Sequence, residues 1–164
     1  AITPRVLDRI RSFVGRTVVT VDSRYDLPRF TGLTAATPNE AELAQLSGVP
    51  VDDERGVEKA GRQLLERLGA RILLVTRGSQ GMALLERDGG STFIPIFGTD
   101  EIADVTGAGD TVIGAFTLAL AAGAAPVDAA TLANMAGGIV VMKRGTATVT
   151  KEELSQALGA AEGP

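Results

Sequence analysis

A strand-like run with few polar positions, Ile72–Thr76, constrains the fold of this chain more than any other feature. A strand with so few polar positions is typical of the middle of a parallel sheet, where both faces are covered. The preceding segment begins with Asp52 as cap, carries one apolar stripe and ends at Gly69, which predicts an amphipathic helix. A helix followed by such a strand indicates an α/β sandwich around a mostly parallel sheet.

The rest of the chain continues this alternation of helices and strands. Further helices are predicted over about 3–14, 38–46, 108–122 and 126–143, with a last one from about 150. Further strands are predicted over 17–21, 33–37, 82–86 and 92–96. Thr3 and Pro4 are typical of a helix start, and the spacing of Thr150 and Glu153 predicts a capping box.

Cysteine and histidine are both absent. Their absence excludes disulfides, zinc sites of the Cys/His kind, thiol nucleophiles and Ser-His-Asp triads. Acid–base chemistry must therefore use Asp, Glu, Lys, Arg or the single tyrosine, Tyr25. The formal net charge of −4 would repel a polyanion, so we expect no nucleic-acid partner.

No segment indicates export or a membrane. Arg5 and Asp8 interrupt the first apolar positions, which is unlike a signal peptide. The most apolar run, 111–125, is shorter than the roughly 20 residues that span a bilayer. We therefore expect no membrane partner and a cytoplasmic location, with which the lack of disulfides agrees. Because the chain starts with Ala1 and its first residues resemble a fold interior, we expect a piece of a longer protein.

The sharpest chemical feature is the Gly-rich stretch 104–110, which leads into an apolar helix. Gly107 and Gly109 remove side chains where the backbone enters that helix, so exposed N–H groups and the helix dipole can bind a phosphoryl group. Asp110 can accept the proton of a hydroxyl group held beside that anion. An ordinary Gly-rich turn before a helix is the alternative interpretation.

The sequence of 104–110, Asp-Val-Thr-Gly-Ala-Gly-Asp, resembles the second signature of the ribokinase (PfkB) family of sugar kinases. Only Val105 departs from that signature, at a position where Thr is common. The resemblance implies that Asp110 is the catalytic base and that Asp104 and Thr106 help to hold a monovalent cation, for which K⁺ is the candidate. It also implies that three residues form the anion hole: Gly107, Ala108 and Gly109.

Asn39-x-x-Glu42 resembles a second motif of the family. A carboxylate one helical turn from an amide can hold Mg²⁺ through its waters beside nucleotide phosphates. The resemblance implies that Asn39 binds the nucleotide and that Glu42 holds Mg²⁺. The alternative is that both residues only begin a helix, where Asn caps and Glu occupies the first turn.

Val75–Gly81 resembles the Val-Thr-x-Gly-x-x-Gly turn of the family. The resemblance implies that this turn approaches the ATP phosphates and ribose, through Thr76, Gly78 and Gly81. A simple hairpin turn is the alternative, and both interpretations can hold together.

Ala133–Ile139 resembles the family's helix at the adenine pocket, which implies a nucleotide contact for Asn134. Gly137 and Gly138 follow, and each costs about 1 kcal/mol within a helix. Close approach of a ligand or of a neighbouring helix would explain why they are there.

Together these motifs imply a ribokinase-like three-layer α/β sandwich that uses ATP and Mg²⁺ to phosphorylate a sugar or sugar phosphate. The resemblance covers the C-terminal, nucleotide-binding and catalytic portion of such a domain, with the N-terminal part and the substrate lid absent from 1–164. We therefore expect the isolated chain to be inactive. The resemblance also allows a homodimer, because the lid often forms the dimer in this family.

The segment Val19–Asn39 is similar to the heptose-phosphate kinases of the family, whose substrate already carries a phosphate. Arg24 or Arg29 could pair with that phosphate, and the alternative is that both are solvated surface arginines. A heptose 7-phosphate type of substrate is thus the first hypothesis. A ribose or fructose type of sugar kinase, and a non-catalytic nucleotide-binding relative or module, remain the alternatives.

Overall fold

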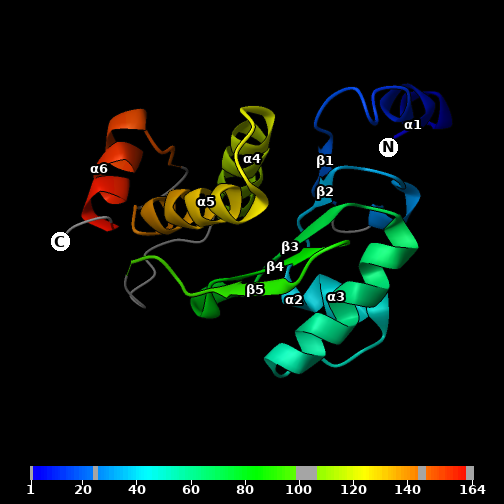
Figure 1. Ribbon diagram of the computed structural model, residues 1–164, viewed down its shortest axis with the longest axis horizontal. Coiled ribbons are helices and arrows are strands. Elements are labelled where there is room, and N and C mark those ends of the chain that lie inside the picture. Colours follow the sequence, from blue (N-terminus) through cyan, green and yellow to red (C-terminus); the bar gives the residue numbers. More distant parts are fainter. Residues whose placement is uncertain (1, 24–25, 99–106, 144–146, 162–164) are drawn as a thin grey trace. The chain divides into compact units, whose positions relative to one another are not determined.

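The computed structural model describes residues 2–23, 26–98, 107–143 and 147–161 (Figure 1). The α-helices are α1 (Pro4–Arg11), α2 (Glu40–Ser47), α3 (Glu54–Leu68), α4 (Ala108–Ala121), α5 (Pro126–Val141) and α6 (Lys151–Ala161). The strands are β1 (Thr20–Val21), β2 (Ala35–Ala36), β3 (Ile72–Thr76), β4 (Met82–Glu86) and β5 (Ser91–Ile94), and two short 3₁₀ turns are η1 (Leu27–Arg29) and η2 (Gly78–Gln80).

The chain forms two compact units. The first unit consists of Ala1–Arg77 and Met82–Phe93, and the second of Gly78–Gly81 and Ile94–Pro164. The first unit holds α1 to α3 and most of the sheet, whereas the second holds α4 to α6.

The strands are ordered β1-β2-β3-β4-β5 in one sheet. β1 pairs with β2, and β2 with β3, in parallel. β4 returns antiparallel to β3, with Ile72 opposite Glu86 and Thr76 opposite Met82. The first four residues of β3 are buried, as the apolar run predicted. Because β1, β2 and β3 are parallel, their carboxyl ends lie at the same edge of the sheet.

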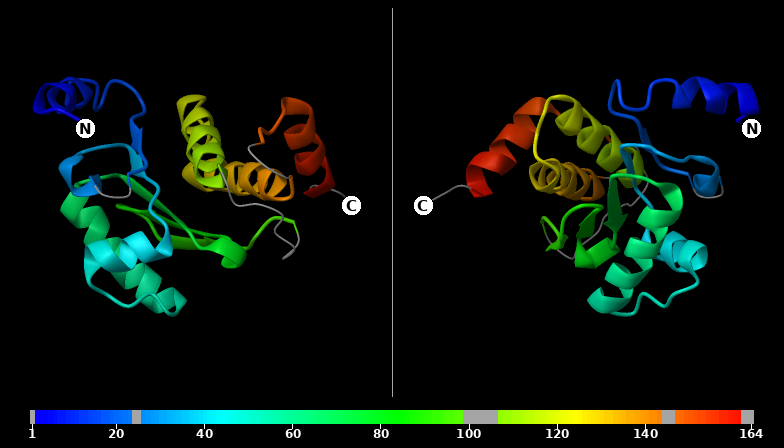
Figure 2. Two further views of the ribbon diagram at one scale, coloured as in Figure 1. Left: turned by 180° about the vertical axis from the view of Figure 1, so that it is seen from behind. Right: turned by 45° about the vertical axis from the view of Figure 1, so that its right-hand side comes forward.

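The core of the first unit lies between α3 and the sheet, and Figure 2 shows α3 from two further sides. α3 turns its buried face to β3 and β4, with Leu64 and Leu68 fully covered. Burying each of these leucines contributes about 2 kcal/mol of hydrophobic free energy. The amphipathic pattern in the sequence is therefore confirmed as a packed helix.

The second unit is helical, with α4 packed against α5 and α5 packed against α6. Phe116 is the large fully buried side chain of α4. The buried face of α5 is made mostly of small residues: Ala129, Ala130, Ala133, Ala136, Gly137 and Gly138. In the described part of the chain, no helix is both long and apolar enough to cross a membrane.

Several element boundaries differ from those predicted. α3 is capped by Asp53 and not by Asp52, because the Asp53 Oδ1 atom accepts a hydrogen bond of 2.7 Å from the Gly56 N–H. The first helix ends at Arg11, before Val14, which instead forms an isolated parallel bridge with Thr17. The strand predicted over 17–21 therefore pairs with the sheet only at Thr20 and Val21, which form β1.

Candidate active site

The Gly-rich stretch leads directly into α4. Gly107 is its N-cap, with a left-handed backbone (φ 80°) that glycine adopts without strain. The Thr111 N–H and the Thr111 hydroxyl group both donate to the Gly107 carbonyl oxygen, each at 3.1 Å. Because glycine has no side chain to cap the helix, the amides of the first turn are left for a ligand or for water.

Asp110 lies in this first turn and is exposed to solvent. Its carboxylate is thus accessible to a substrate hydroxyl group, and the helix dipole there favours an anion. Ala108 and Gly109 supply the neighbouring amides. The arrangement can bind a negatively charged group and place a base beside it.

Three of the predicted site residues fall in parts of the chain outside the described residues. These are the residues assigned to a monovalent cation and to a substrate phosphate: Asp104, Thr106 and Arg24. Their roles remain predictions.

The first unit brings three other predicted residues together. Asn39 Oδ1 accepts from the Glu42 N–H at 2.9 Å, and Glu42 Oε2 accepts from the Asn39 N–H at 3.0 Å, which is a complete capping box for α2. Asn39 also forms an isolated parallel bridge with Thr76, whose N–H donates to the Pro38 carbonyl at 3.0 Å. Thr76 at the end of β3 and the start of α2 are therefore neighbours.

The capping box confirms the structural interpretation of Asn39-x-x-Glu42 and does not exclude a metal. Both side chains offer oxygen atoms, which suit a hard cation such as Mg²⁺. Among the described residues, no group of three or more acidic, His or Cys side chains could enclose an ion directly. The oxygen atoms present fit a Mg²⁺ ion that keeps several of its waters, as this ion usually does in proteins.

A buried arginine beside this site was not expected from the sequence. Arg77 follows Thr76, and its side chain is only 4% exposed. Its Nε atom donates to Glu40 Oε1 at 2.9 Å, and its guanidinium group lies 5.2 Å from the ring centroid of Phe93. Nothing in the sequence marks this arginine as buried, because its partners are distant along the chain.

Gly78 and Gly81 bound the short turn η2, and both have positive φ angles of 55° and 82°. A Cβ atom at Gly81 would overlap the backbone of Ile94 and Ile96. Gly81 is therefore required by the packing of the second unit, so the hairpin interpretation of this turn holds whether or not it also binds a nucleotide.

Asn134 is buried in α5, and its Nδ2 atom donates to the Pro95 carbonyl oxygen at 2.7 Å. A Cβ atom at Gly137 would lie 2.8 Å from Val112 Cγ2 of α4, and one at Gly138 would overlap the carbonyl of Phe97. Close approach of neighbouring protein segments therefore accounts for both glycines.

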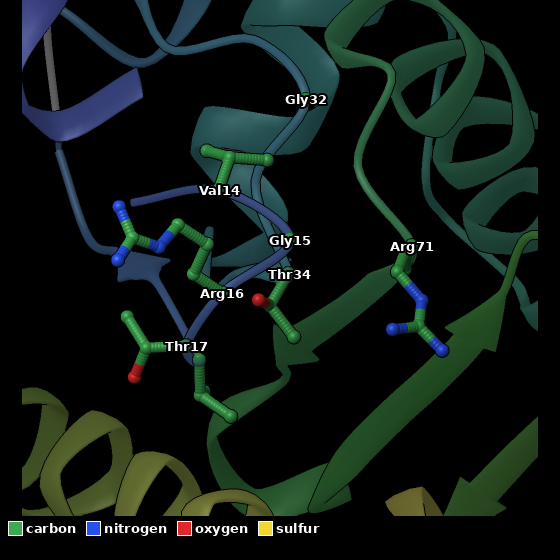
Figure 3. Close-up of a pocket in the computed structure, with 8 residues that line it drawn as sticks. Val14, Gly15, Arg16, Thr17, Gly32, Thr34 and Arg71 are labelled. Carbon is green, nitrogen blue, oxygen red and sulfur yellow. The ribbon is translucent and has the colours of Figure 1, made fainter. Parts of the chain in front are cut away.

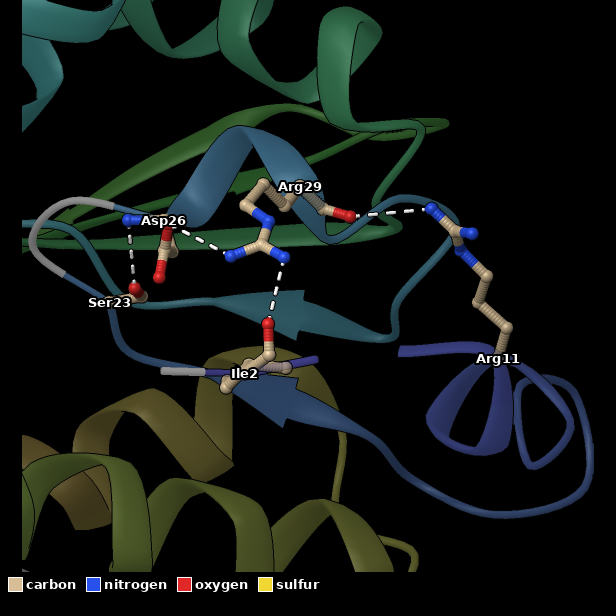
Figure 4. Close-up of polar contacts among 5 residues, drawn as sticks. All are labelled: Ile2, Arg11, Ser23, Asp26 and Arg29. Carbon is tan, nitrogen blue, oxygen red and sulfur yellow. Dashed lines mark hydrogen bonds and ion pairs between the residues drawn. The ribbon is translucent and has the colours of Figure 1, made fainter. Parts of the chain in front are cut away.

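Arg29, the second candidate for a substrate phosphate, holds the N-terminal segment in place (Figure 4). Its Nη2 atom donates to the Ile2 carbonyl at 2.8 Å, and its Nη1 atom lies 3.3 Å from Asp26 Oδ1. Arg11 in turn donates to the Arg29 carbonyl at 3.4 Å. These contacts give Arg29 a structural role.

A pocket of about 350 Å³ in the first unit lies at the amino ends of β1, β2 and β3 (Figure 3). It is lined by Val14, Gly15, Arg16, Thr17, Val18, Gly32, Thr34 and Arg71. Figure 3 shows Arg16 and Arg71 pointing to different sides and not toward a common centre. The predicted motifs of the first unit come at the opposite, carboxyl ends of these strands. Open α/β sheets bind their ligands at the carboxyl ends of the strands. This pocket is therefore not the candidate site.

Comparison with known proteins agrees with these motifs. Residues 22–153 match the family described as pfkB family carbohydrate kinase. The chain is similar to the bifunctional protein HldE of Methylococcus capsulatus, with 45% identity over 150 residues that cover 92% of this chain and 31% of that protein.

Two solved structures show the same likeness. A ribokinase of Thermotoga maritima is 31% identical, with a TM-score of 0.76, over 93% of this chain and 52% of that one. The Arabidopsis thaliana ribokinase, solved with ribose and ATP, is 27% identical, with a TM-score of 0.72, over 77% of this chain and 41% of that one. The expected α/β fold is thereby confirmed, and the chain spans about a third to a half of the length of these relatives.

Proposed function

This chain belongs to the pfkB family of carbohydrate kinases, and from this we propose that its protein transfers the γ-phosphoryl group of ATP to a hydroxyl group of a sugar or sugar phosphate. The observation that carries the proposal is the start of α4, where exposed Asp110 follows the left-handed Gly107 in a helix without a side-chain cap. A base and an anion-binding helix start are thus combined in four residues.

Asp110 accepts the proton of the attacking sugar hydroxyl group. The backbone of Gly107, Ala108 and Gly109 stabilises the negative charge that develops on the phosphoryl group, because their amides and the helix dipole are fixed before the reaction. Phosphoryl transfer needs little from a protein beyond this positioning and charge stabilisation. The relative from Arabidopsis was solved with ribose and ATP, which supports ATP as the donor.

Several further residues are proposed to bind the nucleotide: Asn39, Thr76, Gly78, Gly81 and Asn134. Glu42 would hold Mg²⁺ through water, and the ion would supply positive charge to the phosphates. Asp104 and Thr106 would hold a monovalent cation, with K⁺ as the candidate. These assignments rest on the motifs, and for Asn39, Glu42 and Thr76 also on their proximity in the first unit.

For the acceptor we propose a heptose 7-phosphate type of substrate. The segment Val19–Asn39 carries the resemblance, and Arg24 would pair with the phosphate that the sugar already bears. Because Arg29 is engaged with Ile2 and Asp26, Arg24 is the better candidate of the two. Residues 1–164 would then be the C-terminal nucleotide-binding and catalytic portion of the kinase domain, and a cytoplasmic location is part of this proposal.

The test is a substrate panel on the natural full-length protein with ATP and Mg²⁺. We expect phosphorylation of a heptose 7-phosphate. Activity on ribose or fructose alone would instead favour the alternative that the protein is a ribose or fructose type of sugar kinase. Asp110→Asn should lower kcat by about 100-fold or more and leave ATP affinity nearly unchanged, since general-base loss acts on the chemical step.

Asp128→Asn is the matched control, because Asp128 is also exposed in the first turn of a helix, α5. It should keep wild-type activity. An Asp110→Asn protein that retains more than about a tenth of the wild-type rate would exclude Asp110 as the base, and ATP binding without any sugar phosphorylation would indicate a non-catalytic relative.

A further inference from the structure

Arg77 joins two segments that carry proposed nucleotide contacts. The Thr76 N–H donates to the Pro38 carbonyl, and Thr76 forms a bridge with Asn39. The pair of Arg77 with Glu40, with 2.9 Å between Nε and Oε1, adds a contact one residue further along both segments. The end of β3 and the start of α2 are thus connected at two successive residues of the first segment, Thr76 and Arg77.

The surroundings of Arg77 fix its side chain. It is 4% exposed, and its guanidinium group lies over the ring of Phe93. A buried guanidinium group is costly unless it is paired and hydrogen-bonded, so the Glu40 carboxylate is held close to it. The planar group that both pairs with a carboxylate and stacks on a ring is a property of arginine that lysine does not share.

Charge gives Arg77 a second role. The first turn of α2 carries two carboxylates, Glu40 and Glu42. Unpaired carboxylates so close together would repel nucleotide phosphates. Arg77 offsets the negative charge of Glu40, and Glu42 is the carboxylate of this turn that the proposed function assigns to Mg²⁺.

We propose that Arg77 is a positioning residue for the nucleotide. Through Glu40 it keeps the Thr76 backbone and the start of α2 in one arrangement, and it removes a negative charge from the side that meets the phosphates. Arg77 need not contact ATP. The inference rests on the proposed function, because it takes Asn39, Glu42 and Thr76 as residues that face the nucleotide.

The kinetic test uses Arg77→Met, Glu40→Gln and the double variant in the natural full-length protein. Each single change should raise the KM for ATP about fivefold to tenfold, which lies within the range of about 0.5–2 kcal/mol that residues acting through packed neighbours reach, and should change kcat less than about twofold. The double variant should resemble the single ones, because both changes remove the same interaction. Glu40→Gln keeps the shape of the side chain, so it serves if Arg77→Met does not fold.

Arg62→Met is the control. Arg62 is a partly buried arginine of the first unit, with a side chain that is 33% exposed, and it donates to the carbonyl oxygens of Glu86 and Gly89. It should lower stability without raising the KM for ATP. A rise in KM equal to that of Arg77→Met would show that Arg77 acts only through general stability. Effects of Arg77→Met and Glu40→Gln that multiply in the double variant would show that the two residues act independently, and this would overturn the role of the pair.

Hydrogen exchange of the Thr76 amide tests the same idea without any activity. Its hydrogen bond to Pro38 should open more often when either partner of the Arg77–Glu40 pair is removed, so exchange at Thr76 should accelerate in both single variants and not in Arg62→Met. A wild-type protein that makes no sugar phosphate overturns the proposed function. The exchange result is read independently of that outcome. Unchanged exchange at Thr76 in Arg77→Met and Glu40→Gln overturns the positioning role, and faster exchange supports the view that Arg77 and Glu40 hold β3 to α2.

Discussion

Gly137 and Gly138 are adjacent in α5, where each would be expected to weaken the helix by about 1 kcal/mol. Gly137 admits Val112 of α4, and Gly138 admits the backbone and ring of Phe97. Close packing of these segments offsets the conformational cost of glycine, because dispersion attraction grows as the atoms approach their optimal separation. Gly137 and Gly138 lie in a segment that resembles part of a ligand site, but packing within the protein explains why glycine stands at both positions.

Gly138→Ala should therefore destabilise the protein by about 1–3 kcal/mol, because its Cβ would meet Phe97 Cδ1 at 3.1 Å and overlap the carbonyl. Gly114→Ala in α4 is the control, since a Cβ there has open space. It should stabilise the protein by about 0.5–1 kcal/mol. Denaturant unfolding of both variants measures the difference, and an equal effect of the two changes would contradict the packing explanation.

Among the elements, α6 begins with a capping box that also carries an ion pair. Thr150 and Glu153 form the predicted capping box, in which the Thr150 N–H donates to Glu153 Oε2 at 2.8 Å and the Glu153 N–H donates to Thr150 Oγ1 at 3.2 Å. Lys143, just after α5, lies 2.7 Å from Glu153 Oε1. The hydrogen bond from Lys143, and then that from the Thr150 backbone, lower the pKa of the Glu153 carboxyl group below its ordinary value of 4.5.

Because the pKa of Glu153 is lower in the folded protein, its stabilising effect is present above pH 4.5 and is lost as the pH falls through the folded value. Glu153→Gln should thus lower the melting temperature at pH 7 and make little difference at a pH below that value. Thermal unfolding at the two pH values measures this. Glu152→Gln, at an exposed position in the same turn, is the control and should have a smaller effect at pH 7.

At the scale of the whole molecule, the chain corresponds to about a third of the curated relative and half of the solved ribokinase from Thermotoga maritima. The motifs that it carries are the ones proposed to bind ATP and the metal ions and to supply the base. The resemblance assigns most sugar contacts to a part of the domain that 1–164 does not contain. Phosphoryl transfer needs donor, acceptor and base held together, so a chain with only some of these parts should not turn over.

We therefore expect the 164-residue chain alone to bind ATP weakly at best and to form no sugar phosphate, whereas the natural full-length protein should be active. A coupled assay for ADP release in the presence of each sugar measures both. Phosphorylation of any sugar by residues 1–164 alone would contradict this expectation.

The sequence alone determined the features that depend on neighbours within a few residues. The helix start at Thr3, the Asn39 cap of α2, the capping box of α6 and the buried run of β3 follow from local hydrogen bonds and from apolar periodicity. The Gly-rich start of α4 was found in the same way. One-residue errors such as Asp52 for Asp53 arise because two adjacent residues are equally good caps, and only the path of the backbone selects one.

Only the tertiary structure decided how distant residues are paired. Arg77 and Glu40 are 37 residues apart, and Asn134 and Pro95 are 39 apart. No local pattern marks these partners, because burial and charge pairing depend on which segments the folded chain brings together. The sequence thus predicted the chemistry of the site, whereas the structure showed that buried Arg77 pairs with Glu40 at the start of α2 and that protein packing accounts for the glycines of α5.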